Sequence, residues 1–152
     1  MNDEIQIVAT GSKWIGKGVR TTYSVIKDII TSSKYSLLIT AYYLSNNDIL
    51  EEIENSLKKG VEILMYINDP ENNACNLRNH LNILENNYSN FTIYRIYEDF
   101  FHAKIIISDR KKVLIGSANL TKKGMYSNYE LGVVINNPEI AFEIENIVRR
   151  FK

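Results

Sequence analysis

The sequence predicts an α/β fold in which a mixed β-sheet is flanked by helices on both faces. Three observations predict it: strand-like and helix-like segments alternate over residues 4–86, several β-branched strands follow, and an amphipathic helix comes last. Alternating units followed by consecutive strands build a sheet with both parallel and antiparallel pairs. We expect one domain over residues 1–152, because this length and 45% hydrophobic residues suffice for a self-contained core.

The first half of the chain contains the alternating strands and helices. Glu4–Thr10 alternates between apolar and polar residues, whereas Gly18–Ser32 carries apolar residues at helical spacing. The sequence Ser45-Asn46-Asn47-Asp48 has the form of a capping box and predicts a helix that ends at Gly60, a usual C-terminal glycine. The remaining predicted elements are the strands Tyr35–Tyr43 and Val61–Asn68 and the helix Asn73–Asn86, with Ala74, Leu77, Leu81 and Leu84 turned inward.

The second half changes to a period of two residues. Four β-branched segments predict strands: Phe91–Tyr97, Ala103–Asp109, Val113–Asn119 and Tyr129–Asn136. Asn137-Pro138 then caps a final helix, in which four apolar residues recur every three or four positions: Ile140, Ile144, Ile147 and Phe151.

The charges cancel over the whole chain but not locally. Lysine plus arginine and aspartate plus glutamate both number 18, which excludes a globally polycationic nucleic-acid binder. Residues 61–100 nevertheless carry two basic and six acidic side chains, whereas residues 101–130 carry six basic and two acidic ones. A local positive field is therefore expected in the second half of the chain.

The sequence argues against a disulfide, a metal site, secretion and a membrane span. Cys75 is the single cysteine, which rules out an internal disulfide and a cysteine-based zinc site, and we interpret it as a small residue within a helix. The two histidines, His80 and His102, show no metal-ligand spacing. The N-terminus lacks a secretory signal and no apolar run is long enough for a membrane span, so we expect a cytoplasmic protein.

Polar residues interrupt two of the predicted strands. In Ala103–Asp109, extended geometry puts His102 and Lys104 on one face and turns Asp109 to the other. A two-residue turn at Arg110-Lys111 would pair Asp109 with Lys112, although neither turn residue favours positive φ. The same register predicts two cross-strand pairs: His102 with Asn119, and Lys104 with Ser117.

These four polar groups converge on one patch of an otherwise apolar hairpin. Each would cost desolvation free energy there unless it were paired or served a ligand. An imidazole, an ammonium, a hydroxyl and an amide, without a carboxylate cluster, are groups that hold phosphate oxygens and attack phosphorus. The combination therefore favours a functional site over a structural role.

The pattern His102-x-Lys104-x4-Asp109, followed by Gly116-Ser117-x-Asn119, resembles the HKD signature of the phospholipase D superfamily. The downstream Asn128-Tyr129-Glu130-Leu131-Gly132 is similar to the continuation of that motif, and the leading strands and helices resemble half of a phospholipase D fold. The resemblance covers most of the chain. It implies a single phospholipase D-like domain that hydrolyses phosphodiester bonds without a metal or other cofactor.

The resemblance also implies a role for each matching residue. His102 would be the nucleophile that forms a covalent phosphohistidine, and Lys104 and Asn119 would bind the non-bridging oxygens and stabilise the transition state. Ser117 would lie in the same phosphate site. Glu130 would accept a hydrogen bond from His102 and fix its tautomer.

Three further motif positions are expected to be structural: Asp109, Gly116 and Asn128. Asp109 lies off the patch by parity, and we expect its carboxylate to pair with Lys112 or a neighbouring basic side chain.

One copy of the motif supplies one imidazole, whereas two-step phosphodiester cleavage requires a nucleophile and a separate acid. His80 lies beside an apolar helix stripe without a matching lysine or asparagine, so we interpret it as a boundary residue of a helix. The missing acid is most simply the histidine of a second identical chain. We therefore expect a homodimer with a composite active site, as in the small single-motif bacterial nucleases that this chain resembles.

The substrate is less constrained than the chemistry. Basic residues form a candidate nucleic-acid track at Lys122 and Lys123, with further charges at Arg110–Lys112, Lys13, Lys17 and Arg20. Tyr126 and Tyr129 could stack on bases, although core packing is the favoured interpretation.

Three functions fit these observations. The leading one is a metal-independent, low-specificity endonuclease that cleaves DNA, with single-stranded DNA or RNA as other substrates. The alternatives are a phospholipase D-type lipid phosphodiesterase and a nucleic-acid-binding subunit of a bacterial defence complex. The absence of a membrane segment or amphipathic anchor weighs against the lipid substrate, and the intact nucleophile weighs against a pure binder. Partner proteins for defence or DNA processing stay open.

Overall fold

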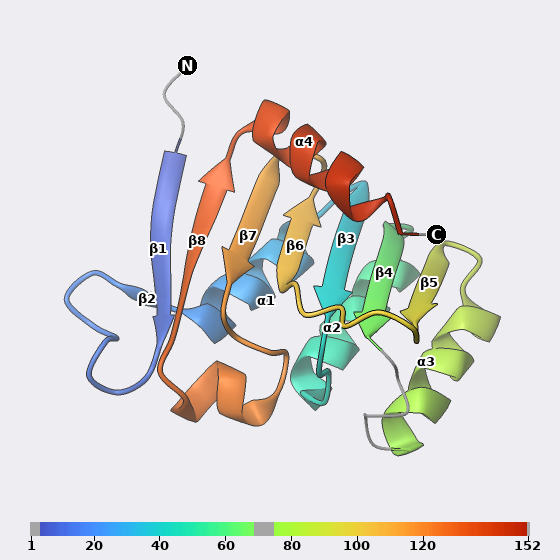
Figure 1. Ribbon diagram of the computed structural model, residues 1–152, viewed down its shortest axis with the longest axis horizontal. Helices are drawn as coiled ribbons and strands as arrows, with labels where there is room; N and C mark the ends of the chain where they lie inside the picture. Colours follow the sequence, from blue (N-terminus) through green and yellow to red (C-terminus); the bar gives the residue numbers. More distant parts are fainter. Residues whose placement is uncertain (1–3, 69–74, 152) are drawn as a thin grey trace.

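The computed structural model describes residues 4–68 and 75–151, which are built around one central β-sheet (Figure 1). Over these residues the sheet has eight strands in the order β2-β1-β8-β7-β6-β3-β4-β5. The strands are β1 (Glu4–Thr10), β2 (Arg20–Thr21), β3 (Ser36–Ala41), β4 (Glu62–Asn68), β5 (Phe91–Ile96), β6 (Ile105–Ser108), β7 (Lys112–Gly116) and β8 (Glu130–Asn136). Because β3, β4 and β5 run parallel while β6, β7, β8 and β1 alternate, the predicted mixed sheet is confirmed.

Helices cover both faces of the sheet, as predicted. They are α1 (Thr22–Ser32), α2 (Asn47–Lys58), α3 (Cys75–Asn87) and α4 (Pro138–Val148), with a short π-helix η2 (Lys123–Ser127) between β7 and β8. One apolar cluster joins α1, α2 and α3 to the sheet, and a second joins α4 to the opposite face. None of the helices in the described part of the chain is long and apolar enough to cross a membrane.

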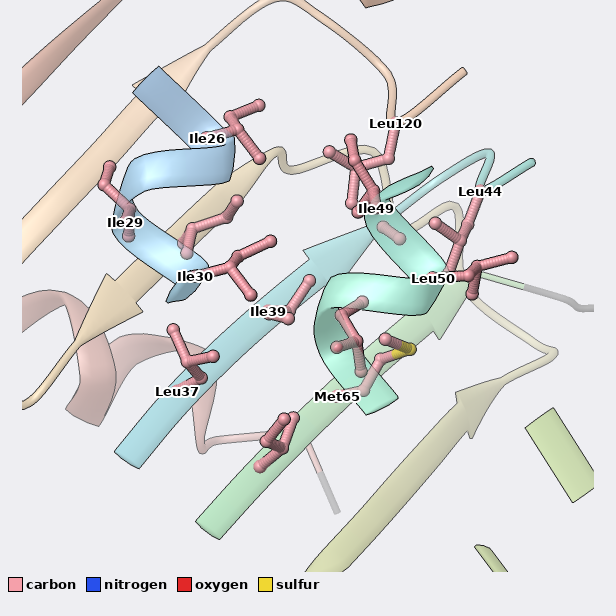
Figure 2. Packing of buried hydrophobic residues seen from close by; sticks show 14 of the residues in the cluster. Ile26, Ile29, Ile30, Leu37, Ile39, Leu44, Ile49, Leu50, Met65 and Leu120 are labelled. Atoms are coloured by element: carbon pink, nitrogen blue, oxygen red, sulfur yellow. The ribbon is translucent and has the colours of Figure 1, made fainter. Parts of the chain in front are cut away.

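The larger cluster is centred where α1 and α2 lie across β3 and β4 (Figure 2). Ile26 and Ile30 of α1 and Ile49 of α2 lie in this cluster with Ile39 and Met65 of the sheet, and all five side chains are almost completely buried. Because these strands are covered on both sides, they read as continuous apolar runs rather than as alternating ones.

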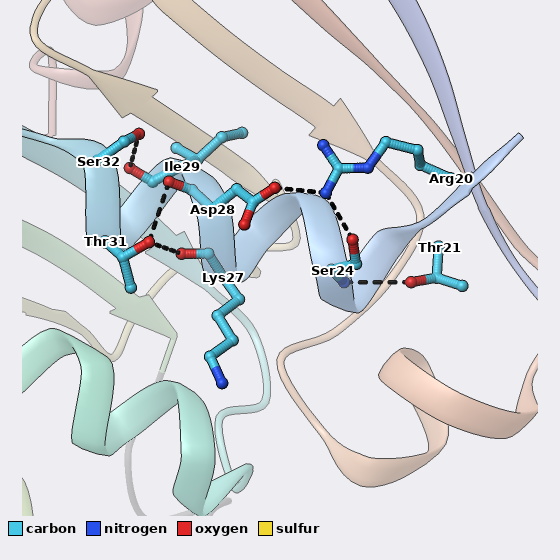
Figure 3. A network of polar contacts seen from close by, with 8 residues as sticks. All are labelled: Arg20, Thr21, Ser24, Lys27, Asp28, Ile29, Thr31 and Ser32. Atoms are coloured by element: carbon cyan, nitrogen blue, oxygen red, sulfur yellow. Dashed lines mark hydrogen bonds and ion pairs between the residues drawn. The ribbon is translucent and has the colours of Figure 1, made fainter.

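The first helix begins at Thr22 rather than at Gly18 as predicted. Arg20 and Thr21 instead form β2 and pair with β1, and the Thr21 hydroxyl accepts a hydrogen bond from the amide of Ser24 (Figure 3). Thr21 is therefore the N-cap, which helical spacing alone did not reveal.

Other element ends follow or correct the sequence prediction. Gly60 has a φ of 89° after the last turn of α2, as expected for a C-terminal glycine. The N-cap of α2 is Asn46, whose side chain accepts from the Ile49 amide.

The cap of α4 at Asn137 is confirmed, but Ile147 is 56% exposed and Phe151 lies beyond the helix. The first predicted residues of α3, 73–74, lie outside the described residues.

Candidate active site

The predicted site residues gather at one end of the sheet. There the parallel strands β3 and β4 end, β7 ends, and β6 and β8 begin (Figure 1). The carboxyl ends of parallel strands are where α/β sheets usually bind ligands, because chain segments diverge there and leave room.

His102 and Lys104 contact one another directly. The Lys104 Nζ lies 3.1 Å from Nδ1 and 3.3 Å from Nε2 of the His102 ring, and donates to the His102 carbonyl oxygen at 2.9 Å. Burial lowers the pKa of Lys104, and the negative charge of Glu130 partly opposes this effect. The imidazole and the ammonium thus face the same small volume, as a phosphate-binding nucleophile site requires.

Aromatic rings hold the imidazole on two sides. Phe100 stacks on His102 with ring centroids 5.3 Å apart and planes inclined by 11°, while Tyr42 meets it edge-on at 4.6 Å. The Lys104 ammonium also lies 5.8 Å from the centre of the Tyr42 ring. These contacts restrict the orientation of an otherwise exposed histidine ring.

Two buried polar side chains that sequence analysis missed hold the segment around His102. Asn68 Oδ1, at the end of β4, accepts from the Phe101 amide at 2.9 Å. Thr40, in β3, donates its hydroxyl to the Ala103 carbonyl and accepts from the Ile105 amide, both at 2.8 Å. Both side chains are at least 97% buried, since only 2% of Thr40 and 3% of Asn68 is exposed. The available signal was a polar residue near the end of each apolar strand.

The predicted hydrogen bond from His102 to Glu130 is not formed in this chain. Ser117 donates to one Glu130 carboxylate oxygen, and Asn128 Nδ2 donates to the other at 3.3 Å. The Ser117 hydroxyl in turn accepts from the Leu131 amide at 3.1 Å. Both oxygens of the carboxylate are therefore engaged beside Lys104 rather than on the imidazole.

Asn119 shares a narrow cavity with Lys104, Thr40 and Tyr42. Its Oδ1 is buried without a hydrogen-bond partner among the described residues. A side-chain amide can exchange its oxygen and nitrogen by rotation, so this position can offer either an acceptor or two donors to a ligand. Gly124 fixes the backbone here, because a Cβ at that position would lie 2.1 Å from the Asn119 carbonyl oxygen.

The hairpin register differs by one residue from the prediction. Ser108 pairs with Lys112, and the connecting loop places positive φ angles at Asp109 and Arg110 rather than at Arg110-Lys111. The predicted pairs of His102 with Asn119 and of Lys104 with Ser117 are therefore wrong. All four residues lie beyond the paired ends of β6 and β7, at the same end of the sheet, and Lys104 and Asn119 line one cavity there.

Gly116 and Gly132 face each other in the ladder between β7 and β8. A Cβ on Gly116 would lie 3.0 Å from the Cα of Gly132 and from the Leu131 carbonyl oxygen, so a larger residue would require the backbone of β8 to shift. The structural role predicted for Gly116 has this physical basis.

Asp109 lies at the far end of β6 from Lys104 and does not pair with Lys112. Its carboxylate accepts hydrogen bonds from the amides of Lys34, Tyr35 and Ser36, at distances between 2.7 and 3.2 Å. Burial alone would raise the pKa of Asp109, but the three amides and the charge of Lys111 outweigh it and lower that pKa. Asp109 thus anchors the hairpin to the loop before β3.

The remaining predicted residues lie around or away from this site. Lys122 and Lys123 are exposed at the start of η2, and Tyr126 and Tyr129 are exposed too, so their predicted core packing is wrong. His80 is half-buried on α3 and lines a separate pocket. Within residues 4–68 and 75–151, no three histidine, cysteine or acidic side chains are grouped to hold a metal ion.

Known proteins are similar to this chain in sequence and in fold. The family model described as "Cardiolipin synthase, PLD-like domain" matches residues 26–152. DISARM protein DrmC of Bacillus paralicheniformis is 29% identical, covering 95% of this chain and 61% of DrmC. Cardiolipin synthase A of Buchnera aphidicola is 28% identical over 91% of this chain and 28% of the synthase. The chain therefore spans less than two thirds of these curated relatives.

A solved structure shows the same architecture. Nuc from Salmonella typhimurium, a phospholipase D family member, superposes with a TM-score of 0.83 at 24% identity. The match covers 99% of this chain and 94% of Nuc. This similarity supports the fold described above.

We predict that Thr40→Val loosens the segment around His102. The valine keeps the volume but leaves the Ala103 carbonyl and the Ile105 amide without their partner, at a cost of about 1–3 kcal/mol in unfolding free energy. Urea unfolding and amide hydrogen exchange at Ile105 measure both effects. Thr40→Ser keeps the hydroxyl and is the matched control; equal exchange in the two variants would contradict this role.

We predict that Asp109 stabilises the fold only where it is ionised. Because its folded pKa is depressed, its contribution is complete above the unfolded value of about 3.9 and disappears as the pH falls through the lower folded value. Asp109→Asn should therefore be less stable than wild type at pH 7, and the difference should shrink in acid. Urea unfolding across this range tests it, with the exposed Asp99→Asn as control. A pH-independent difference would refute the charge effect.

Proposed function

This chain belongs to the phospholipase D-like family, and from that premise we propose that its 152 residues act as one phosphodiesterase domain that cleaves nucleic acid. The observation that carries the proposal is the direct contact between His102 and Lys104 beside the Asn119 amide, whose oxygen has no hydrogen-bond partner among the described residues. A nucleophile, a cation and an amide around one volume fit a tetrahedral phosphate and its five-coordinate transition state.

In the first step, a nitrogen of His102 attacks the phosphorus of the diester. An N–P bond forms, the bond from phosphorus to one ester oxygen breaks, and a separate acid protonates the departing alcohol. Lys104 and Asn119 hold the non-bridging oxygens while their charge increases. In the second step, that acid, now a base, takes a proton from water; the hydroxide displaces His102 and leaves a phosphate monoester.

Glu130 and Ser117 have an indirect part in this scheme. Since the Glu130 carboxylate is held by Ser117 and Asn128, it does not orient His102 within the chain. Its charge favours the ammonium form of Lys104 against the effect of burial. Ser117 directs its proton to Glu130, so its contribution to the phosphate site would come through this carboxylate.

The acid must come from outside this set of side chains, since the second histidine of the sequence, His80, lies on α3 in a separate pocket. We propose that His102 of the partner subunit in a homodimer supplies it, across a twofold axis. The exposed ring of His102 is compatible with such an approach. The two imidazoles would then exchange the roles of nucleophile and acid by symmetry.

The exposed Lys122 and Lys123, next to Asn119 in sequence, favour a polyanionic substrate bound through its backbone. DNA is the leading substrate, with RNA as a second. A lipid phosphodiesterase is the alternative, favoured by the cardiolipin synthases among the relatives. A nucleic-acid-binding subunit of a defence complex is a third function, supported by the similarity to DISARM protein DrmC.

We predict that the chain cleaves plasmid or single-stranded DNA in excess EDTA, and that His102→Ala lowers the rate by about 10³-fold or more because it removes the nucleophile. Gel assays measure the cleavage of DNA and RNA, and a parallel assay measures head-group release from phosphatidylcholine. His80→Ala is the matched control and should retain the wild-type rate. Release of lipid head groups alone would support the lipid alternative, and DNA binding without cleavage would support the third function.

We also predict that His102→Ala chains suppress wild-type chains when the two are mixed. If one composite site needs both imidazoles, a 1:1 mixture after subunit exchange should show about one quarter of the wild-type rate, against about one half for independent chains. Sedimentation of the mixture confirms the dimer, and His80→Ala chains serve as the control. Activity proportional to the wild-type fraction would contradict the composite site.

A further inference from the structure

Trp14 and Tyr129 form an exposed pair of rings beside the site. Their centroids lie 5.1 Å apart with the planes inclined by 66°, and the two residues are 48% and 46% exposed. Tyr129 immediately precedes Glu130, whose carboxylate is bound to Ser117. The loop that carries Trp14 follows β1 and lies at the same end of the sheet as the start of β8 (Figure 1).

The pair is held in place by the backbone of its loop. The amides of Trp14 and Ile15 donate to the Gly11 carbonyl at 3.0 and 3.2 Å, which closes a turn at the backbone of Trp14. The Tyr129 ring packs on Gly11, where a Cβ would lie 2.4 Å from the ring and where φ is +113°. Rings fixed in this way lose little entropy when a ligand stacks on them.

The loop around the indole is cationic. Lys13 and Lys17 are both exposed, and Lys17 lies in a turn closed by the hydrogen bond from the Val19 amide to the Gly16 carbonyl at 3.0 Å. Arg20 does not add to this charge, because it is paired with Asp28 and Ser24 of α1 (Figure 3). From Gly11 to Val19 the sequence contains no acidic residue.

We propose that Trp14 and Tyr129 form a stacking subsite for an unpaired base, with Lys13 and Lys17 against the adjoining phosphates. Aromatic rings beside cations are the usual means of binding single-stranded nucleic acid without reading its sequence. A base within a duplex has both of its faces covered, so the subsite selects single strands. This inference rests on the proposed function and adds the strand preference.

Trp14 is the only tryptophan in the chain, so its fluorescence reports on the subsite directly. The His102→Ala protein is titrated with oligothymidylate and with an abasic oligonucleotide of the same length and charge. Stacking predicts quenching by oligothymidylate and an affinity about 5- to 150-fold higher than for the abasic strand. Equal affinities without quenching would overturn the subsite.

Substitutions test the same subsite in the active protein. Trp14→Leu and Tyr129→Leu keep apolar bulk on the loop and should lower the cleavage of single strands relative to duplex by about 5- to 150-fold. Tyr35→Ala is the control, since Tyr35 is 75% exposed but lies before β3, at the opposite end of the sheet from the site. An unchanged ratio in both loop variants would overturn the proposal.

Failure of the subsite and failure of the proposed function give different results. Cleavage of DNA without quenching of Trp14 would remove the subsite and leave the nuclease. Absence of cleavage of any nucleic acid by the wild-type chain would remove the proposed function. A blue shift of Trp14 on phosphatidylglycerol vesicles, with neither quenching by oligonucleotides nor cleavage of any nucleic acid, would overturn both and favour a lipid surface.

Discussion

The geometry of the site depends on one buried hydroxyl group. The ladder between β3 and β6 ends at the pair of Ile39 and Ile106, and from there the Thr40 side chain takes the place of a main-chain partner for Ala103 and Ile105. Asn68 does the same for Phe101 from the next strand. The residues before and after His102, Phe101 and Ala103, are thus both fixed by side-chain hydrogen bonds. The segment is joined to β3 through the Thr40 side chain instead of through main-chain hydrogen bonds. Lys104, Tyr42 and Asn119 line the narrow cavity beside this segment.

The polar groups of the site differ in whether their hydrogen bonds are already made. Glu130, Ser117 and Asn128 satisfy one another, whereas the amide oxygen of Asn119 is buried with no partner in the described part of the chain. A buried unpaired amide costs free energy in the empty site, and a ligand that binds it recovers that cost. The carboxylate of Glu130 is therefore already occupied, whereas the Asn119 amide oxygen is left for a ligand. The Lys104 ammonium, which contacts the His102 ring and carbonyl oxygen, supplies positive charge beside it.

Much of the fold and of the motif could be predicted from the sequence. The change from a helical period to a period of two residues correctly predicted the mixed sheet. The capping residues Asn137 and Gly60 correctly predicted the start of α4 and the end of α2. The register of the hairpin was predicted wrongly because the turn was placed at Arg110-Lys111. The positive φ angles fall on Asp109 and Arg110, and of the three residues only aspartate is of a type enriched at positive φ. Thr40 was also missed, since a threonine within an apolar strand is typical of any buried sheet.

Contacts between distant segments were the hardest to foresee. Trp14 and Tyr129 meet only because β1 and β8 are neighbours in the sheet, and no local pattern encodes that pairing. For the same reason the partners that Glu130 has within the chain, Ser117 and Asn128, were not predicted.

The three backbone amides that donate to the Asp109 carboxylate give this residue a structural role separate from that of His102 and Lys104. Because this aspartate ties a hairpin to the loop before β3, it stabilises the fold, whereas the contact between the histidine and the lysine at the other end of β6 does not tie the hairpin to that loop. A descendant that had abandoned catalysis would be free to lose the imidazole while still being selected to keep the aspartate. Among divergent homologues, an isolated aspartate at this position therefore marks common ancestry and architecture rather than retained chemistry.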